Sequence, residues 1–304
     1  MAPRVSIGLP IYNAGEEFTR AAIETILNQK YEDFEFLISD NGSTDGETVA
    51  TIEEYLDKDD RIIFIRGRRN MGAQPNYDRL FEQSQGEYFS WKAHDDRFDP
   101  HWLGACVEAL DANPEAVLAY TDHIEIDEHG NVLDLDTRYT LDIANPDPVA
   151  RFLSVACDPH PCYPLFGLMR ASTLASTNLH GNYVGSDRVL LAEFAANGPF
   201  EYIPEKYFLH GEHSLRSVNV HDKEHERRNW FDVKYTKKFD FPNWKYVKEY
   251  YKAIQRSSMS KDDKKRAIKG MQRWVSDRKA DLARDVLRPV KSAVTTVKSK
   301  VSNG

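Results

Sequence analysis

The sequence is poor in cysteine and has no long apolar run. Its three cysteines, Cys106, Cys157 and Cys162, do not make a disulfide framework, and nothing near the last two completes a zinc site. We therefore expect reduced thiols in a cytosolic protein. No apolar stretch approaches the roughly 20 residues that span a bilayer. Residues 1–4 lead straight into an apolar segment, so we also expect no secretory signal.

The charge of the chain is unevenly distributed. The 304 residues carry a formal net charge of −8, which argues against general nucleic-acid binding. With 41% hydrophobic and 29% charged residues, the composition is typical of a globular protein. Residues 261–304 hold 13 lysines and arginines against 5 aspartates, a net charge of +8 that leaves −16 for the first 260 residues. This asymmetry indicates a basic C-terminal tail with a partner of its own.

Short apolar runs alternate with amphipathic segments over the first 120 residues. The apolar runs predict buried strands, and the segments between them have the spacing of helices that bury one face. Strands are expected at 5–9, 34–39, 61–66, 87–91 and 116–120, and helices at 16–28, 45–56, 74–83 and 100–110. This alternation predicts an α/β fold with a mostly parallel sheet flanked by helices and joined by right-handed crossovers.

The remainder of the chain is less regular. Residues 124–132 predict a hairpin that turns at His129-Gly130, and residues 158–164, with three prolines, predict a loop. A further helix is expected at 186–197 and a further strand at 200–208.

The basic tail is amphipathic. Apolar residues recur with near-helical spacing between 262 and 301, which predicts one or two helices kinked or broken at Pro289. Two uses fit this pattern. The apolar face packs on the rest of the protein and leaves the basic face in solvent, or the helices bind an anionic membrane surface.

Polar residues follow three of the expected strands, at the edge where open α/β sheets bind ligands. Asp95 and Asp96 follow the fourth strand, and adjacent carboxylates repel each other unless a cation lies beside them. A Mg²⁺ or Mn²⁺ ion held by one or two carboxylates and by substrate phosphates is the usual arrangement. The plainer alternative is a helix start, which we assign to Asp99 and Pro100 instead. Residues 40–45 fit either a turn that hydrogen-bonds a polar ring or an ordinary strand–helix turn.

Four motifs, taken together, resemble the family 2 glycosyltransferases of the GT-A fold. They are Pro10-x-Tyr12-Asn13, Asp40-Asn41-Gly42-Ser43-Thr44-Asp45, Asn70-Met71-Gly72 and Asp95-Asp96-x-x-x-Pro100. Their order and spacing match over roughly residues 4–120, and weaker matches continue to about residue 217. The resemblance implies an inverting transferase that uses a nucleotide-diphosphate sugar and a divalent metal, Mn²⁺ or Mg²⁺.

The resemblance also implies roles for individual residues. Asp40 would accept a hydrogen bond from the base, Gly72 would let the backbone approach the nucleotide, and Asp95 would bind the metal next to the diphosphate. The remaining residues expected to line the nucleotide pocket are Pro10, Tyr12, Asn13 and Asn41.

The chain departs from the family's metal motif at one position. Ala93 stands where the family has the first Asp, and His94, which we also expect near the donor, fills the middle position. Either Asp96 or a water replaces the missing contact, or the dependence on metal is weak. We expect the neighbouring Lys92 at the surface, with contact to a phosphate as the alternative.

Two later segments match the acceptor side of the family. In Gly185-Ser186-Asp187-Arg188, Asp187 takes the second position of an acidic pair and Ser186 replaces the first, which implies that Asp187 is the general base. A position in the first turn of a helix explains Asp187 equally well, and both roles are compatible. His210, with His213 as the alternative, matches a histidine near the metal, and a surface histidine is the plainer reading.

The resemblance thus predicts a catalytic domain over about residues 1–220 and a helical extension over 221–304. The donor would bind to residues 1–120 and the acceptor to residues 121–220. The expected reaction is non-processive transfer of one hexose to a glycan or lipid-linked acceptor, in the cytoplasm or at the cytoplasmic face of a membrane. Two alternatives stay open: a nucleotidyltransferase, although residues 10–15 lack its usual basic loop, and a non-catalytic nucleotide- or carbohydrate-binding module of the same fold.

Overall fold

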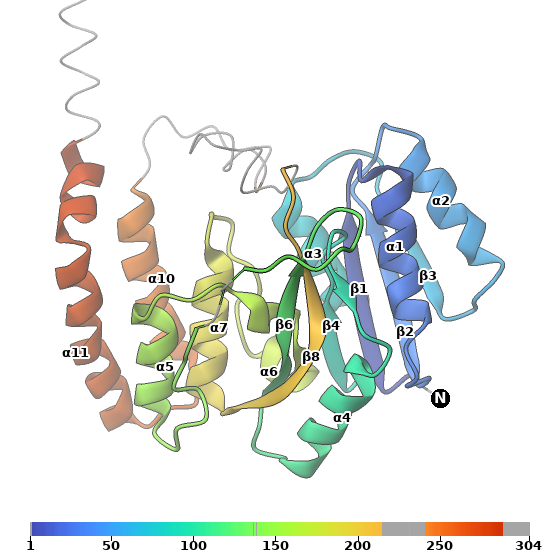
Figure 1. The fold of residues 1–304 in the computed structure, drawn as a ribbon. Helices are drawn as coiled ribbons and strands as arrows, with labels where there is room; N and C mark the ends of the chain where they lie inside the picture. The colour runs from blue at the N-terminus through green and yellow to red at the C-terminus, as the bar shows by residue number, and fades with distance from the viewer. Residues whose placement is uncertain (1, 136, 138, 215–230, 232–240, 288–304) are drawn as a thin grey trace, which may run out of the picture.

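The computed structural model describes residues 2–135, 137, 139–214, 231 and 241–287. Within them, one eight-stranded sheet runs in the order β3-β2-β1-β4-β7-β6-β8-β5 (Figure 1). The strands are β1 Val5–Ile11, β2 Phe34–Asp40, β3 Ile62–Arg66, β4 Tyr88–Trp91, β5 Arg97–Phe98, β6 Leu118–Ile126, β7 Leu168–Arg170 and β8 Phe200–Gly211. The helices are α1 Gly15–Leu27, α2 Glu47–Leu56, α3 Ala73–Gln83, α4 Trp102–Ala112, α5 Pro148–Cys157, α6 Ala171–Ala175, α7 Ser186–Asn197, α10 Pro242–Arg256 and α11 Lys261–Asp277, with a 3-10 turn η1 at Tyr163–Phe166.

The first half of the sheet is parallel. β1 pairs with β2 on one side and with β4 on the other, and β2 pairs with β3, all in parallel register. Every residue of β1, β2 and β4 is buried, which explains why these strands are continuous apolar runs rather than alternating ones. The predicted α/β fold with a mostly parallel sheet is confirmed, and the expected elements of this half lie within two residues of the observed ones.

Helices cover both faces of the sheet. One core packs side chains of α1, α2 and α4 against one face. The other core packs α3, α5 and α7 against the opposite face, and α10 and α11 extend it. In Figure 1, α11 lies outermost on the side of the molecule away from β3, and α10 lies between α11 and α7. All parallel strands end at the same edge of the sheet.

The second half of the sheet is mixed. β7 pairs antiparallel with β4 and β6, whereas β6 and β8 are parallel from Leu118↔Phe200 to Ile126↔Gly211. The predicted turn at His129-Gly130 is confirmed, because Ile126 and Val132 form an antiparallel bridge and the Leu133 amide donates to the Glu125 carbonyl at 2.8 Å. Residues 124–126 also form the end of β6 and pair with β8, which the sequence did not predict.

Apart from the short η1, four elements were not expected from the sequence. They are β5, α5, β7 and α6. The start of α5 does carry a local signal, since the Asp147 side chain accepts from the Val149 amide at 3.0 Å and Pro148 occupies the first turn. The expected loop at 158–164 ends earlier, because residues from Tyr163 onward form η1.

The described part of the basic tail packs on the sheet-covering helices. Ala267, Met271 and Trp274 of α11 are buried in the same core as α5 and α7, while Lys261, Lys265 and Lys269 are exposed. The apolar face therefore covers protein in this part of the tail. Pro289, the expected break, lies outside the described residues. Among the helices that are described, none combines the length and apolarity needed to cross a membrane.

Candidate active site

A cavity of about 450 Å³ lies at the carboxyl ends of β2 and β3. It is lined by Asp40, Gly42, Ser43, Thr44, Arg66, Gly67 and Arg68. Asp40 is 1% exposed, and its Oδ1 accepts from the Ser43 amide at 2.9 Å. Its Oδ2 is buried and has no hydrogen-bond donor among the described residues. A buried carboxylate oxygen without a donor is costly, so this pocket is suited to a ligand that brings an N–H group.

Asparagine side chains connect the loops around this cavity. The Asn13 Oδ1 accepts from the Thr44 amide at 2.8 Å, which links the end of β1 to the loop after β2. The Asn41 side chain donates to the Gly72 carbonyl at 2.9 Å and accepts from the Met71 amide at 3.0 Å. These bonds hold three loops of one sheet edge as a single unit.

The structure brings the residues expected for the nucleotide together at that edge. Pro10 is buried in β1, Tyr12 is 39% exposed beside it, and Gly72 adopts φ 94°, a left-handed conformation that favours glycine. Gly42 is equally constrained, because a Cβ there would lie 2.6 Å from the Arg69 backbone. The geometry fits a nucleotide pocket, and the individual roles stay predictions.

Each carboxylate after β4 is paired with a histidine from the end of β8. The Asp96 Oδ1 lies 2.9 Å from the His210 Nδ1 and accepts from the Gly211 amide at 3.0 Å. The Asp95 Oδ2 lies 3.1 Å from the His213 Nε2. Both histidines that sequence reasoning named are therefore buried beside the acidic turn rather than at the surface.

Nearby charged groups offset the cost of burying the turn that carries Asp95 and Asp96. Burial alone would raise the pKa of Asp95, but the charge of His94 and the hydrogen bond from His213 outweigh it and lower that pKa. The prediction that Lys92 lies at the surface is wrong, because its side chain is fully buried. Its ammonium donates to the Ala93 carbonyl at 3.1 Å and to the Asp96 carbonyl, and burial lowers its pKa to about 8. A buried ammonium group thus contacts the turn that carries the two aspartates.

Asp187 is brought to the same region by α7. It lies in the first turn of that helix, after Gly185, which adopts φ 80°. Burial, and then the charges of Asp95, Asp96 and Asp187, raise the pKa of Tyr77 on α3. All three carboxylates therefore lie close enough to act on one phenol. Sequence reasoning missed Tyr77, because nothing in α3 distinguishes it from a residue of the apolar face.

The side chains present fit a divalent cation. Ligand atoms of Glu125, His210 and Glu212 lie within 4.8 Å of one another. One oxygen each of Glu125 and Asp96 is buried without a hydrogen-bond donor among the described residues. Carboxylate and imidazole ligands suit Mn²⁺. Glu125 and Glu212 were missed in the sequence, because only the pairing of β6 with β8 places Glu125 opposite His210.

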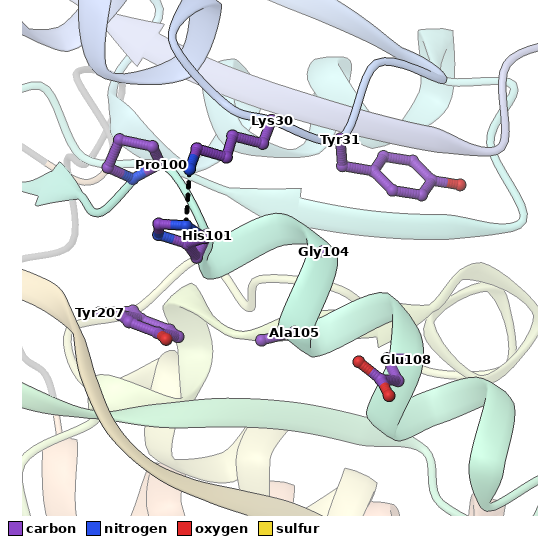
Figure 2. Close-up of a pocket in the computed structure, with 8 residues that line it drawn as sticks. All are labelled: Lys30, Tyr31, Pro100, His101, Gly104, Ala105, Glu108 and Tyr207. Atoms are coloured by element: carbon purple, nitrogen blue, oxygen red, sulfur yellow. Dashed lines mark hydrogen bonds between the residues drawn. The ribbon is translucent and has the colours of Figure 1, made fainter.

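A second cavity, of about 400 Å³, lies elsewhere, along α4. Figure 2 shows its lining and the contact between Lys30 Nζ and His101 Nε2, which are 2.8 Å apart. None of the residues expected in the active site lines it. The candidate active site is therefore the edge formed by the ends of β1, β2 and β4.

The sequence matches a known family over more than half of its length. Residues 6–171 match the model of Glycosyl transferase family 2. An uncharacterised glycosyltransferase of Methanocaldococcus jannaschii is 32% identical over 131 residues, which cover 43% of this chain and 45% of that protein. The O-antigen biosynthesis protein RfbC of Myxococcus xanthus is 26% identical over 129 residues, which cover 42% of this chain and 10% of that protein. The chain thus spans less than half the length of these relatives.

Solved structures share the fold over nearly the whole chain. Residues 1–349 of S. aureus TarS, in complex with UDP-GlcNAc, give a TM-score of 0.65 at 13% identity and cover 94% of this chain and 79% of that chain. The mannosyltransferase PcManGT of Pyrobaculum calidifontis, in complex with GDP-Man and Mn²⁺, gives 0.54 at 14% identity and covers 98% and 80%. At such identities the likeness shows the fold alone, which is the GT-A fold expected from the motifs.

Proposed function

The chain belongs to glycosyl transferase family 2, and we propose that it moves one sugar from a nucleotide-diphosphate sugar to an acceptor hydroxyl with inversion. The observation that carries this proposal is the Asp40 cavity at the ends of β2 and β3, together with three carboxylates, Asp95, Asp96 and Asp187, that all act on Tyr77. The base would bind in the cavity, the diphosphate beside Asp95 and Asp96, and the acceptor beside Asp187.

The donor we propose is a UDP- or GDP-sugar. An ionised carboxylate only accepts hydrogen bonds, so the Asp40 Oδ2 selects a base whose pairing edge carries a ring N–H, as uracil and guanine do. The two similar structures are complexes with UDP-GlcNAc and with GDP-Man. Asn41 and Gly72 would shape the backbone around the nucleotide, and Tyr12 and Asn13 would border it.

Mn²⁺ or Mg²⁺ is the cofactor we propose. Asp95, Asp96 and His210 would hold it, and we propose Glu125 as a further ligand because its carboxylate lies near His210. When bound, such an ion neutralises the charge that grows on the diphosphate leaving group. Lys92 would help to position the metal ligands, because its ammonium donates to two carbonyls of the turn that carries the two aspartates.

Asp187 is the general base in this proposal. It takes the proton from the acceptor hydroxyl as that oxygen attacks the anomeric carbon from the face opposite the nucleotide. A single displacement needs no nucleophilic side chain. We propose a glycan or lipid-linked acceptor, reached at the cytoplasmic face of a membrane, to which the outer basic face of α11 would be attracted.

Nucleotide release from UDP- and GDP-sugars tests the proposal. Wild type, Asp95→Asn and the control Asp57→Asn, an exposed residue just after α2, are compared with Mn²⁺ and after chelation. We expect release that requires Mn²⁺, falls about a hundredfold in Asp95→Asn and is unchanged in the control. Binding without turnover, indifferent to metal and to Asp95→Asn, would instead indicate the non-catalytic module.

A further inference from the structure

Helix α10 contacts the turn that carries Asp187. The Tyr246 hydroxyl of α10 donates to the Val184 carbonyl at 3.0 Å. Gly185 lies directly beneath that hydroxyl, and a Cβ at this position would overlap it. Gly185 also adopts φ 80°, so both its backbone conformation and its surroundings exclude a side chain. The turn and the helix therefore meet at backbone distance, two residues before Asp187.

Tyr246 is itself fixed by aromatic packing. Its ring centroid lies 6.2 Å from that of Tyr250 and 6.1 Å from that of Trp274 on α11. Tyr183, on the other side of Val184, meets the Tyr246 ring edge-on at 6.0 Å, and the Lys245 ammonium lies 5.2 Å from the centre of the Tyr183 ring. Burial, followed by the charge of Asp187, raises the pKa of Tyr246, so this hydroxyl stays a donor at neutral pH.

The far end of α10 is bonded to the far end of α7. The Arg256 guanidinium makes two bonds to the Glu193 carboxylate, at 2.8 and 2.7 Å, and Glu193 is 2% exposed. The Ser258 amide donates to the Asn197 side chain at 2.8 Å. Helix α7 is thus held by α10 at both ends, and its first turn has little freedom to move away from the sheet edge.

We propose that Tyr246 is a positioning residue, and that α10 holds the Val184–Asp187 turn so that the Asp187 carboxylate faces the acceptor. This inference rests on the proposed role of Asp187 as general base. It places part of the catalytic apparatus in residues 242–256, beyond the family match, which ends at residue 171. The C-terminal extension would then complete the active site rather than follow it as a separate unit.

Tyr246→Phe tests the inference, with Tyr251→Phe as the matched control. Tyr251 lies on the same helix but is 52% exposed. We expect Tyr246→Phe to lower kcat for nucleotide release about tenfold, because small misplacements of a catalytic group are costly. The KM for the donor should change less than twofold, since the cavity proposed for the nucleotide lies at the ends of β2 and β3. Tyr251→Phe should match wild type in both constants.

Hydrogen–deuterium exchange supplies a second readout that needs no turnover. Tyr246→Phe should exchange faster than wild type in peptides that cover 183–190, and equally in peptides that cover 36–45. Unchanged exchange at 183–190, or a kcat within twofold of wild type, would overturn the inference. An equal change in kcat and donor KM would overturn it too, because it would indicate a general structural effect.

Asp187→Asn separates the two proposals. If Asp187→Asn lowers kcat while Tyr246→Phe has the wild-type kcat, only the positioning role is contradicted. If Asp187→Asn keeps wild-type kcat, the assignment of the base fails, and the positioning role that rests on it fails as well.

Discussion

The two halves of the active-site edge are built in different ways. On the donor side, the groups of the site lie within a few residues of the ends of β1, β2 and β4, and neighbouring loops hold them through short bonds such as Asn41 to Gly72. On the acceptor side, contacts join groups far apart in the sequence, such as the Val184 carbonyl with the Tyr246 hydroxyl and Glu193 with Arg256. The donor side is thus specified locally, whereas the acceptor side depends on tertiary contacts.

The largest expected effect is on the acceptor side. Asp187→Asn should lower kcat for sugar transfer or hydrolysis about a thousandfold, because a general base typically contributes a factor of this order. Titration calorimetry with UDP or GDP should give the wild-type affinity, since Asp187 does not line the nucleotide cavity. Weaker nucleotide binding in this variant would remove the distinction between the two halves.

Arg256→Gln should show the dependence of the acceptor side on a distant pair. The change leaves the buried Glu193 carboxylate without its partner, so we expect the free energy of unfolding to fall by about 2–3 kcal/mol in urea titrations. Arg20→Gln is the control, because its partners Glu16 and Glu54 are exposed, and it should change that free energy far less. Equal losses in both variants would contradict the comparison.

Asp40→Asn should weaken nucleotide binding about tenfold, because it removes a charge-assisted hydrogen bond to the base while keeping the shape of the side chain. The kcat at saturating donor should stay close to that of wild type, in contrast to Asp187→Asn. Calorimetry with UDP and GDP gives the affinity, and a selectivity among nucleotides that does not change would contradict the role of Asp40.

The smallest effect is expected on the outer face of α11. Lys265→Glu combined with Lys269→Glu should reduce binding to vesicles that contain anionic lipid about fivefold or more, without changing kcat for a soluble donor. Co-sedimentation measures the bound fraction. Equal binding by the variant would leave only the packing role of this helix, which its buried apolar face already fulfils.

The contrast between the donor side and the acceptor side also explains which residues of the site could be predicted from the sequence. The donor side was predictable, because apolar runs give the strands and the residues after them give Asp40, Asn41 and Asp95. On the acceptor side, only groups inside a local pattern were named, such as Asp187 and His210. Glu125 was missed because its partner strand β8 lies more than 70 residues later.

Lys92 shows a further limit of local reasoning. A lysine is normally exposed, and no pattern around residue 92 indicates otherwise. Its burial depends on two carbonyls of the following turn and on Phe98, whose ring centre lies 5.3 Å from the ammonium. The burial of Lys92 can therefore be recognised only from the three-dimensional structure of the turn after β4.

The anomeric configuration of the first product tests the central claim most directly. In this account the donor side holds the leaving nucleotide and the acceptor side presents the base from the opposite face of the sugar. Proton NMR, recorded during hydrolysis of UDP-α-GlcNAc or GDP-α-mannose before mutarotation, should therefore show the β-anomer first. Initial release of the α-anomer would contradict the single displacement and the opposed placement of the two halves.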